Sequence, residues 1–350
     1  MDLIRKILII PQEKRFRMVW RLLGQTILLG VVVIPANVLL GFLTLILLYA
    51  EQGEGVFEQI DPDAVTAFVL SQPLLLLASS LATLIGIVLS MWAAARLLDR
   101  RPLADFGLRL NRAWWRDLGF GLLLGALLMT LIFVVELALG WVVVTGTFQA
   151  AGGGAFAPAI VVPLLQFIMV GIYEEMLNRG YHLSNLAQGL SSLIGPRAGL
   201  LAGWVLSSAV FGLLHATNPN ATWLSTVNIM LAGMFLLGMG YLLTGRLGLS
   251  IGVHITWNFF QGNVFGFPVS GLPSTVSFVA IEQRGDDLLT GGAFGPEAGL
   301  IGLVAMLLGA ALTVLWVRWQ QGRAVLELAI TAPPVPRAAP AEPPAPREQV

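Results

Sequence analysis

Three side chains that can carry acid–base chemistry, and one amide that can donate hydrogen bonds, lie in otherwise apolar stretches of the sequence. Glu174 follows one apolar run, His215 ends a second, and His254 lies within a third, four residues before Asn258. Ionisable residues are costly inside a membrane, and those that occur there usually serve a function. A single buried histidine is more often a satisfied core residue, but two of the three histidines of this chain lie in neighbouring apolar runs. The pattern therefore predicts one shared polar site.

Helical spacing separates two adjacent acids. Glu175 and Arg179 are four residues apart with the acid on the N-terminal side, which is the favourable order for an ion pair on a helix. Glu174 points about 100° away from Glu175. Phe211 lies one turn before His215 and shares its face. Pairing accounts for Glu175 and Arg179 and leaves Glu174 without a partner on its own helix.

A glutamate, two histidines and an asparagine suit peptide hydrolysis. A partly desolvated carboxylate can act as a general base on water, and a histidine can share that role. Histidine and asparagine can also donate hydrogen bonds to a developing oxyanion. The same Glu174, His215 and His254 could instead hold a divalent metal such as zinc, because two imidazoles and a carboxylate are a common catalytic zinc set. The chain has no His-Glu-x-x-His helix, so spacing does not choose between these alternatives.

The composition places these residues in a membrane. Hydrophobic residues make up 56% of the 350 and charged residues 11%, whereas roughly a quarter of the residues of a soluble domain are charged. The absence of cysteine excludes disulfides, thiolate catalysis and cysteine-ligated metals. Lys+Arg and Asp+Glu balance at 20 each, so net charge gives no reason to expect a nucleic-acid partner.

About 20 apolar residues are needed to cross a bilayer as a helix. We therefore predict an all-α polytopic bundle of about eight spans. These lie near 22–50, 64–95, 117–146, 157–179, 198–216, 226–244, 249–265 and 298–319.

The basic residues predict which side of the bundle faces the cytoplasm. Every lysine and arginine except Arg284 falls on one side of this eight-span arrangement. Because cytoplasmic loops collect Lys and Arg, both termini are expected inside a multi-pass protein of the cell membrane.

The predicted spans and loops divide the chain into six parts. These are a cytoplasmic basic leader (1–21), a three-span region (22–146), a four-span catalytic core (157–265), an extracytoplasmic loop (266–297), an eighth span (298–319) and a disordered Pro- and Ala-rich tail (331–350).

This arrangement sets a geometric condition on the site. His215 falls near the outer end of its span, whereas Glu174 and His254 fall nearer the cytoplasmic side. For them to meet, the fourth helix must continue past Arg179 towards Leu190. The Asn-Pro break after His215 must also lie in a cavity lined by protein, because irregular backbone is tolerated at membrane depth only there.

The motifs resemble a known family. Glu174-Glu175-x-x-x-Arg179, Phe211-x-x-x-His215 and His254-x-x-x-Asn258 match, in order, the signature motifs of the CPBP (CAAX protease and bacteriocin-processing) intramembrane proteases, which are related to the type II CAAX prenyl endopeptidase. The resemblance implies that Glu174 activates water with help from His215 and that His254 and Asn258 stabilise the oxyanion. It implies supporting roles for Glu175, Arg179 and Phe211.

The resemblance also implies an activity. It implies an intramembrane endopeptidase, of a class labelled metallopeptidase, that hydrolyses membrane-associated proteins or peptides, prenylated CAAX-like or leader-bearing ones among them. We expect metal-free chemistry and cleavage near the cytoplasmic leaflet, while a divalent metal, the substrate and the oligomeric state stay open. The alternatives are a non-proteolytic scaffold or chaperone of the same family and, less favoured because the spans show no duplication, a small-solute transporter.

Overall fold

The structure is a computed structural model that describes residues 8–11, 13, 15–53, 65, 68–69, 72–150 and 154–333. The first seven residues of the predicted leader lie outside this part of the chain, as do residues 334–350 of the predicted tail.

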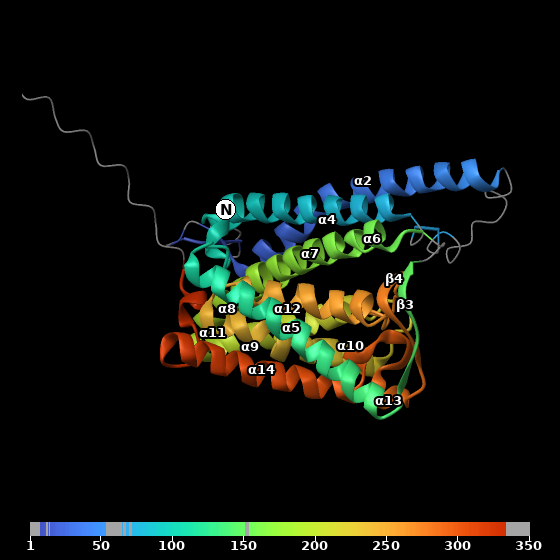
Figure 1. Ribbon diagram of the computed structural model, residues 1–350. Coiled ribbons are helices and arrows are strands. Elements are labelled where there is room, and N and C mark those ends of the chain that lie inside the picture. Colours follow the sequence, from blue (N-terminus) through green and yellow to red (C-terminus); the bar gives the residue numbers. More distant parts are fainter. Residues whose placement is uncertain are drawn as a thin grey trace, which may run out of the picture.

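A bundle of long apolar helices makes up most of the described chain (Figure 1). Among the described residues, seven helical stretches are long and apolar enough to cross a bilayer, which confirms the all-α polytopic class. They are Met18–Glu51, Pro73–Asp99, Arg112–Ala138, Phe156–Ile194, Pro196–Leu214, Trp223–Thr244 and Leu300–Gln321. The helices that form them are α2 (Met18–Gln52), α4 (Pro73–Ala94), α5 (Arg112–Ala138), α6 (Phe156–Ala159), α7 (Val161–Glu175), α8 (Ser184–Ile194), α9 (Pro196–Leu214), α10 (Trp223–Leu231), α11 (Met239–Thr244) and α14 (Leu300–Gln321).

The predicted seventh span is a shorter helix at the centre of the bundle. It consists of the twelve residues of α12 (Gly248–Phe259) and five residues of π-helix, η7 (Phe260–Val264). It packs closely on α5 because Gly252 lies against the backbone of α5, and Gly121 of α5 lies against the backbone of α12. A Cβ at either glycine would overlap backbone atoms of the other helix. The small residues therefore let α12, which carries His254 and Asn258, sit deep in the protein.

The fourth helix continues well past Arg179, as the predicted meeting of the site residues requires. After α7 the chain passes through a π-helical segment, η5 (Met176–Leu183), into α8, and the helical stretch ends only at Ile194. Glu174 therefore lies near the middle of a 39-residue stretch. Another π-helical segment, η6 (Ala232–Gly238), joins α10 to α11.

The third helix ends earlier than predicted. α5 stops at Ala138, Gly140 has a positive φ of 72°, and β3 (Val142–Ala150) follows in place of the last turns of the expected span. The β-branched residues of 142–145 favour a strand over a helix. β3 pairs antiparallel with β4 (Val276–Gln283), so the predicted extracytoplasmic loop contributes a strand to a two-stranded ribbon. The small helix α13 (Asp287–Thr290) follows β4.

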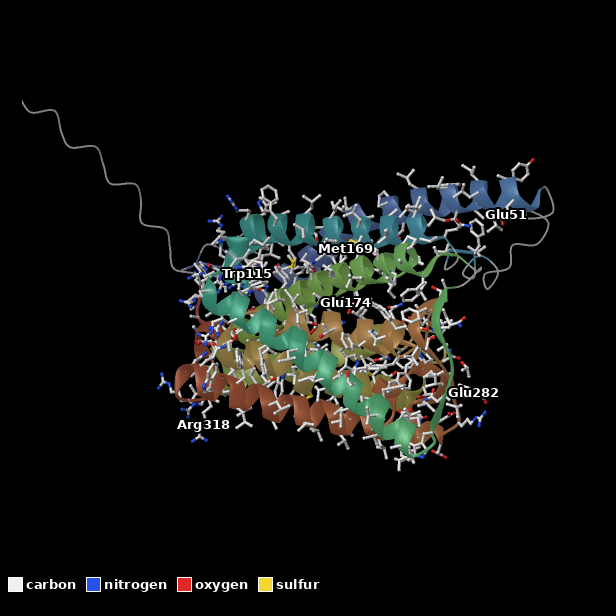
Figure 2. The ribbon with its side chains drawn as sticks, in the orientation of Figure 1. Glu51, Trp115, Met169, Glu174, Glu282 and Arg318 are labelled. Atoms are coloured by element: carbon white, nitrogen blue, oxygen red, sulfur yellow. The ribbon has the colours of Figure 1, made fainter. Side chains whose placement is uncertain are left out.

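The two ends of the bundle differ in charge. α5 begins at Arg112, Arg246 lies between α11 and α12, and Arg318 lies in the last turn of α14. We call this the basic end; Figure 2 shows Arg318 there and Glu282 at the opposite end, beside the ribbon. We call the opposite end the ribbon end, and its only described cation is Arg284. The start of α2 and the end of α14 both lie at the basic end (Figure 1). That this end faces the cytoplasm stays a prediction.

Four arginines that the sequence pattern assigns to the leader or to loops are instead buried, namely Arg15, Arg21, Arg101 and Arg179. Arg179 is 1% exposed in the middle of the bundle. Arg21, the last residue of the predicted leader, lies within α2 and is also 1% exposed. Arg21 donates to Asp99 Oδ1 at 2.9 Å, and the Tyr181 hydroxyl donates to Asp99 Oδ2 at 2.8 Å. A buried charge is tolerated only where it is paired, and Arg21 and Asp99 pair with each other. Their contacts join α2 and η5 to the residues that follow α4.

Candidate active site

One cavity collects the predicted catalytic residues. Its volume is about 510 Å³, and Glu174, His215, His254 and Asn258 all line it together with Phe211. They come from three helical stretches that are separated along the chain, and the stretch that carries Glu174 packs against both of the others. In Figure 2 Glu174 lies halfway between the two ends of the bundle.

Glu175 joins two of these stretches. Its side chain is fully buried, and its Oε1 atom accepts hydrogen bonds from Arg179 Nη1 at 2.9 Å and from His254 Nδ1 at 2.8 Å. The ion pair with Arg179 is the one that helical spacing predicts. The contact with His254 was missed, because the sequence carries no signal for which face of α12 meets α7.

The Arg179 guanidinium is satisfied from three directions. It pairs with Glu175, its Nη2 donates to the carbonyl oxygen of Gly233 at 3.1 Å, and its carbon lies 4.4 Å from the centroid of the Phe211 ring. Gly233 belongs to η6, and a Cβ there would lie 3.0 Å from Arg179 Nη2. The wider turns of a π-helix leave carbonyl groups available for such partners, and π-helices are frequent at functional sites. Phe211, predicted as a packing neighbour, therefore lies on the Arg179 guanidinium.

His254 is held so that its other nitrogen lies near Glu174. Because the Glu175 carboxylate can only accept, Nδ1 of His254 carries the proton of that hydrogen bond. Its Nε2 atom lies 3.8 Å from Oε2 of Glu174, which is longer than a direct hydrogen bond. The His254 side chain is 7% exposed and the Glu174 side chain 26% exposed. Glu174 is thus the acid that reaches the cavity, as its lack of a local partner suggests.

His215 lies on another wall of the cavity. It follows the last residue of α9, and its Nδ1 donates to the carbonyl oxygen of Phe211 at 2.8 Å. The centroids of the Phe211 and His215 rings are 4.7 Å apart. Within the described part of the chain, His215 forms no ion pair with Glu174 or Glu175. The imidazole beside Glu174 is that of His254, although the resemblance assigns the assisting role to His215.

Asn258 completes the predicted set. It lies one turn after His254 on α12, is half-buried and lines the cavity. Its side-chain amide makes no hydrogen bond to any described residue, so its N–H groups are available to a ligand in the cavity.

A further acid in the cavity wall was missed. Glu297 lies just before α14, is 4% exposed and lines the cavity. Its Oε1 accepts from the backbone N–H of Ser270 at 2.6 Å, and its Oε2 accepts from the side-chain amide of Gln261. The sequence pattern grouped it with the acids of an exposed loop. Only the folding of residues 266–297 back over the bundle buries it.

The donor set of the candidate metal site does not converge in this structure. Nδ1 of His215 and of His254 donates to a carbonyl and to a carboxylate respectively, which is how metal-binding histidines are usually oriented. Yet among the described residues no three or more His, Asp or Glu side chains lie close enough together to hold a metal ion. Glu174, His215 and His254 share a cavity without forming a ligand set.

Fold and site together define a class: a multi-pass helical membrane protein whose interior cavity holds carboxylate, imidazole and amide groups. Residues 156–260 match the family of type II CAAX prenyl endopeptidase Rce1-like proteins. The matched segment contains all three motifs and covers less than a third of the chain, and it confirms the resemblance to the CPBP family. No curated protein and no solved structure matches the chain. At the level of the family, these findings support an intramembrane protease of CAAX type.

Proposed function

We propose that this protein hydrolyses a peptide bond of a membrane-associated substrate inside the cavity, with Glu174 as the group that activates water. The observation that carries the proposal is the approach of Glu174 Oε2 to within 3.8 Å of His254 Nε2, while Glu175 holds the opposite nitrogen of the same ring. At this separation the two atoms do not bond directly, and a water molecule beside them can contact both.

We assign the reactive proton from the charges of the cluster. Glu174 and Glu175 supply two negative charges and Arg179 one positive charge, so one additional proton makes the cluster neutral. A neutral cluster is much less costly to bury than a charged one. Because Arg179 and Glu175 pair with each other, we place this proton on Nε2 of His254 and leave Glu174 as the carboxylate. This gives the site one group that can accept a proton and one that can donate it.

The hydrolytic step follows from that arrangement. The Glu174 carboxylate takes a proton from water, and the oxygen of the water bonds to the carbonyl carbon of the scissile peptide. The oxyanion that forms accepts hydrogen bonds from the protonated Nε2 of His254 and from the amide of Asn258. The carbon–nitrogen bond then breaks, and the proton held by Glu174 passes to the leaving amine. Preorganised donors of this kind commonly provide a large share of the rate enhancement.

His215 has a secondary role in this proposal. Its Nδ1–H is held by the Phe211 carbonyl, so the neutral ring has an unprotonated Nε2. A proton acceptor in the cavity wall can relay a proton between water and Glu174. We therefore expect loss of His215 to slow hydrolysis less than loss of Glu174.

The proposal is tested with purified protein in liposomes that contain a panel of membrane-anchored peptides. Glu174→Gln should lower the cleavage rate by about 10²- to 10⁴-fold, the range that a general base contributes. Glu282→Gln is the matched control, because Glu282 is exposed at the ribbon end and pairs only with Arg284. Equal cleavage by Glu174→Gln and the control would remove Glu174 from the mechanism.

A further inference from the structure

The cavity reaches the surface at the ribbon end of the bundle. Its lining runs from the site to the segment 269–275, and four of its lining residues are exposed. These are Leu214 at the end of α9 and Leu272, Pro273 and Thr275 between η7 and β4. Towards the basic end, the lining stops at the buried Asn178 and the half-buried His182. The mouth therefore lies between the end of α9 and the segment 269–275, which we call the mouth loop.

The mouth loop is fixed on its inner side. Asn218 donates to the carbonyl oxygen of Ser270 at 3.0 Å, and Asn220 donates to that of Gly271 at 3.1 Å. The Ser270 N–H donates to buried Glu297. Ser270 and Gly271 both have positive φ angles, of 49° and 86°, and form the turn of the loop. These contacts give the mouth a defined edge.

The charge pattern predicts that the mouth lies outside the cell. The connections at the opposite end carry nearly all the described arginines, and short arginine-rich connections stay in the cytoplasm. The mouth lies beside the ribbon, where Arg284 is the single described cation. A cavity that opens there takes its substrate from the extracytoplasmic side.

The wall of the cavity also limits what can enter. Glu174 and Glu297 line it, and no lysine or arginine among the described residues does. Arg179 is turned away into its pair with Glu175. A substrate with a free terminal carboxylate would thus bury a negative charge in a cavity whose described wall offers no lysine or arginine to pair with it, which is unfavourable in a medium of low dielectric constant. An internal segment that is neutral or cationic buries no such charge.

We propose that the substrate is an internal, neutral or cationic segment of a membrane-anchored or exported polypeptide, and that it enters the cavity from the extracytoplasmic side past the mouth loop. This inference rests on the proposed hydrolysis. Under this inference the substrate enters from the side opposite the cytoplasmic leaflet, near which we expected cleavage from the sequence. It also separates this protein from enzymes that act on a carboxyl-terminal tail presented in the cytoplasm.

The chain contains no cysteine, so single cysteines can report on the side of the mouth. Three variants form a matched set: Thr275→Cys at the mouth, Thr147→Cys on the exposed part of β3 at the same end, and Ser192→Cys on exposed α8 at the basic end. Each is expressed in cells and treated from outside with a bulky membrane-impermeant maleimide, and cleavage of a membrane-anchored peptide is then measured.

The inference predicts a distinct result for each variant. The maleimide should label Thr275→Cys and Thr147→Cys from outside and leave Ser192→Cys unlabelled until the membrane is permeabilised. Labelling should abolish cleavage only in Thr275→Cys. A Thr275→Cys protein that is labelled only after permeabilisation, or that cleaves normally when labelled, overturns the inference. Absence of cleavage in all unlabelled variants would instead count against the proposed function, and the labelling pattern would still decide the side of the mouth.

The preference for an internal segment has its own test. Two peptides of identical sequence, one with a free carboxyl terminus two residues beyond the cleaved bond and one with that terminus amidated, are compared in liposomes. The amidated peptide should be cleaved with a kcat/KM at least about tenfold higher, the factor that corresponds to about 1.4 kcal/mol. Equal values, or a preference for the free carboxylate, overturn the charge argument.

Discussion

Nδ1 of His254 donates to Oε1 of Glu175 at 2.8 Å, and the same carboxylate oxygen accepts from Arg179. Glu175, the second acid of the first motif, therefore holds His254 of the third motif in place. This contact orients the imidazole so that its other nitrogen lies near Glu174. The two adjacent glutamates consequently have different tasks: Glu175 positions the imidazole, and Glu174 faces the cavity.

Glu175→Gln tests that division. The variant leaves the buried Arg179 guanidinium without its charge partner, and breaking a buried pair costs about 3–5 kcal/mol of stability. We expect a lowered thermal unfolding temperature in detergent. In the fraction that remains folded, kcat should fall while KM changes little, because His254 loses its orientation but the cavity keeps its shape. An unfolding temperature like that of the wild-type protein would show that the contacts of Glu175 with Arg179 and His254 do not stabilise the fold.

Gly233→Ala tests the contact between η6 and Arg179. The added methyl group would lie 3.0 Å from Arg179 Nη2 and 3.4 Å from the Phe211 ring, so the guanidinium must shift. Overpacking of this kind costs about 1–3 kcal/mol, and we expect cleavage to fall as well. Gly119→Ala in α5 is the control, because nothing lies within 4 Å of its added Cβ. Thermal unfolding should show destabilisation for Gly233→Ala and none for Gly119→Ala, and equal behaviour would contradict the proposed crowding.

The stability of the protein should depend on the ionisation of Glu297. Burial raises the pKa of this carboxyl to about 7 from a usual value of 4.5, against the opposing effect of its hydrogen bonds. The folded protein therefore keeps a proton that the unfolded chain loses, and stability falls as pH rises from about 4.5 to about 7. The expected loss is roughly 3 kcal/mol at about 1.36 kcal/mol per pH unit.

Glu297→Gln should remove this contribution to the pH dependence. The side chain of Gln261 can rotate to offer its oxygen, which has no partner in the wild-type protein, to the new amide. Unfolding of both proteins is measured in detergent across this pH range. The wild-type curve should fall more steeply with rising pH than that of the variant. Parallel curves would show that Glu297 does not titrate in this range.

Removal of metal distinguishes the two chemistries that the sequence leaves open. The candidate ligands do not converge in this structure, and we expect the protein to keep its cleavage activity after extensive treatment with a chelator. Metal content is measured on the same samples. A stoichiometric metal whose removal stops cleavage and whose return restores it would show that Glu174, His215 and His254 move together to bind it.

Much of the site follows from local rules. The pair Glu175 and Arg179 comes from helical spacing, and the presence of Glu174 and the two histidines in one cavity fits a fourth helix that continues past Arg179. The contact of His254 with Glu175 depends on how α12 packs between α5 and α7, and a single sequence does not encode that packing in any local pattern. The burial of Glu297 has the same cause, since it depends on where a loop folds back.

The sequence predicts the helices that follow from long apolar runs. It predicts less well the places where a helix ends at a glycine or at β-branched residues. Helices such as α2, α4 and α14 follow from long apolar runs. The early end of α5 depends on Gly140 and the β-branched residues after it, which look like further apolar span when only hydropathy is considered. The π-helical segments have no recognised sequence signature, although η5 follows Glu175 directly and η6 provides the carbonyl that Arg179 uses.

The central claim is that Glu174 activates the water that enters the product. Wild-type protein, Glu174→Gln and Glu282→Gln are incubated in liposomes with a membrane-anchored peptide in oxygen-labelled water, and the fragments are weighed by mass spectrometry. We predict that wild type and Glu282→Gln give a fragment whose new carboxyl carries one labelled oxygen, and that Glu174→Gln forms this fragment at least about 10²-fold more slowly. A labelled fragment formed by Glu174→Gln at the wild-type rate would contradict the account.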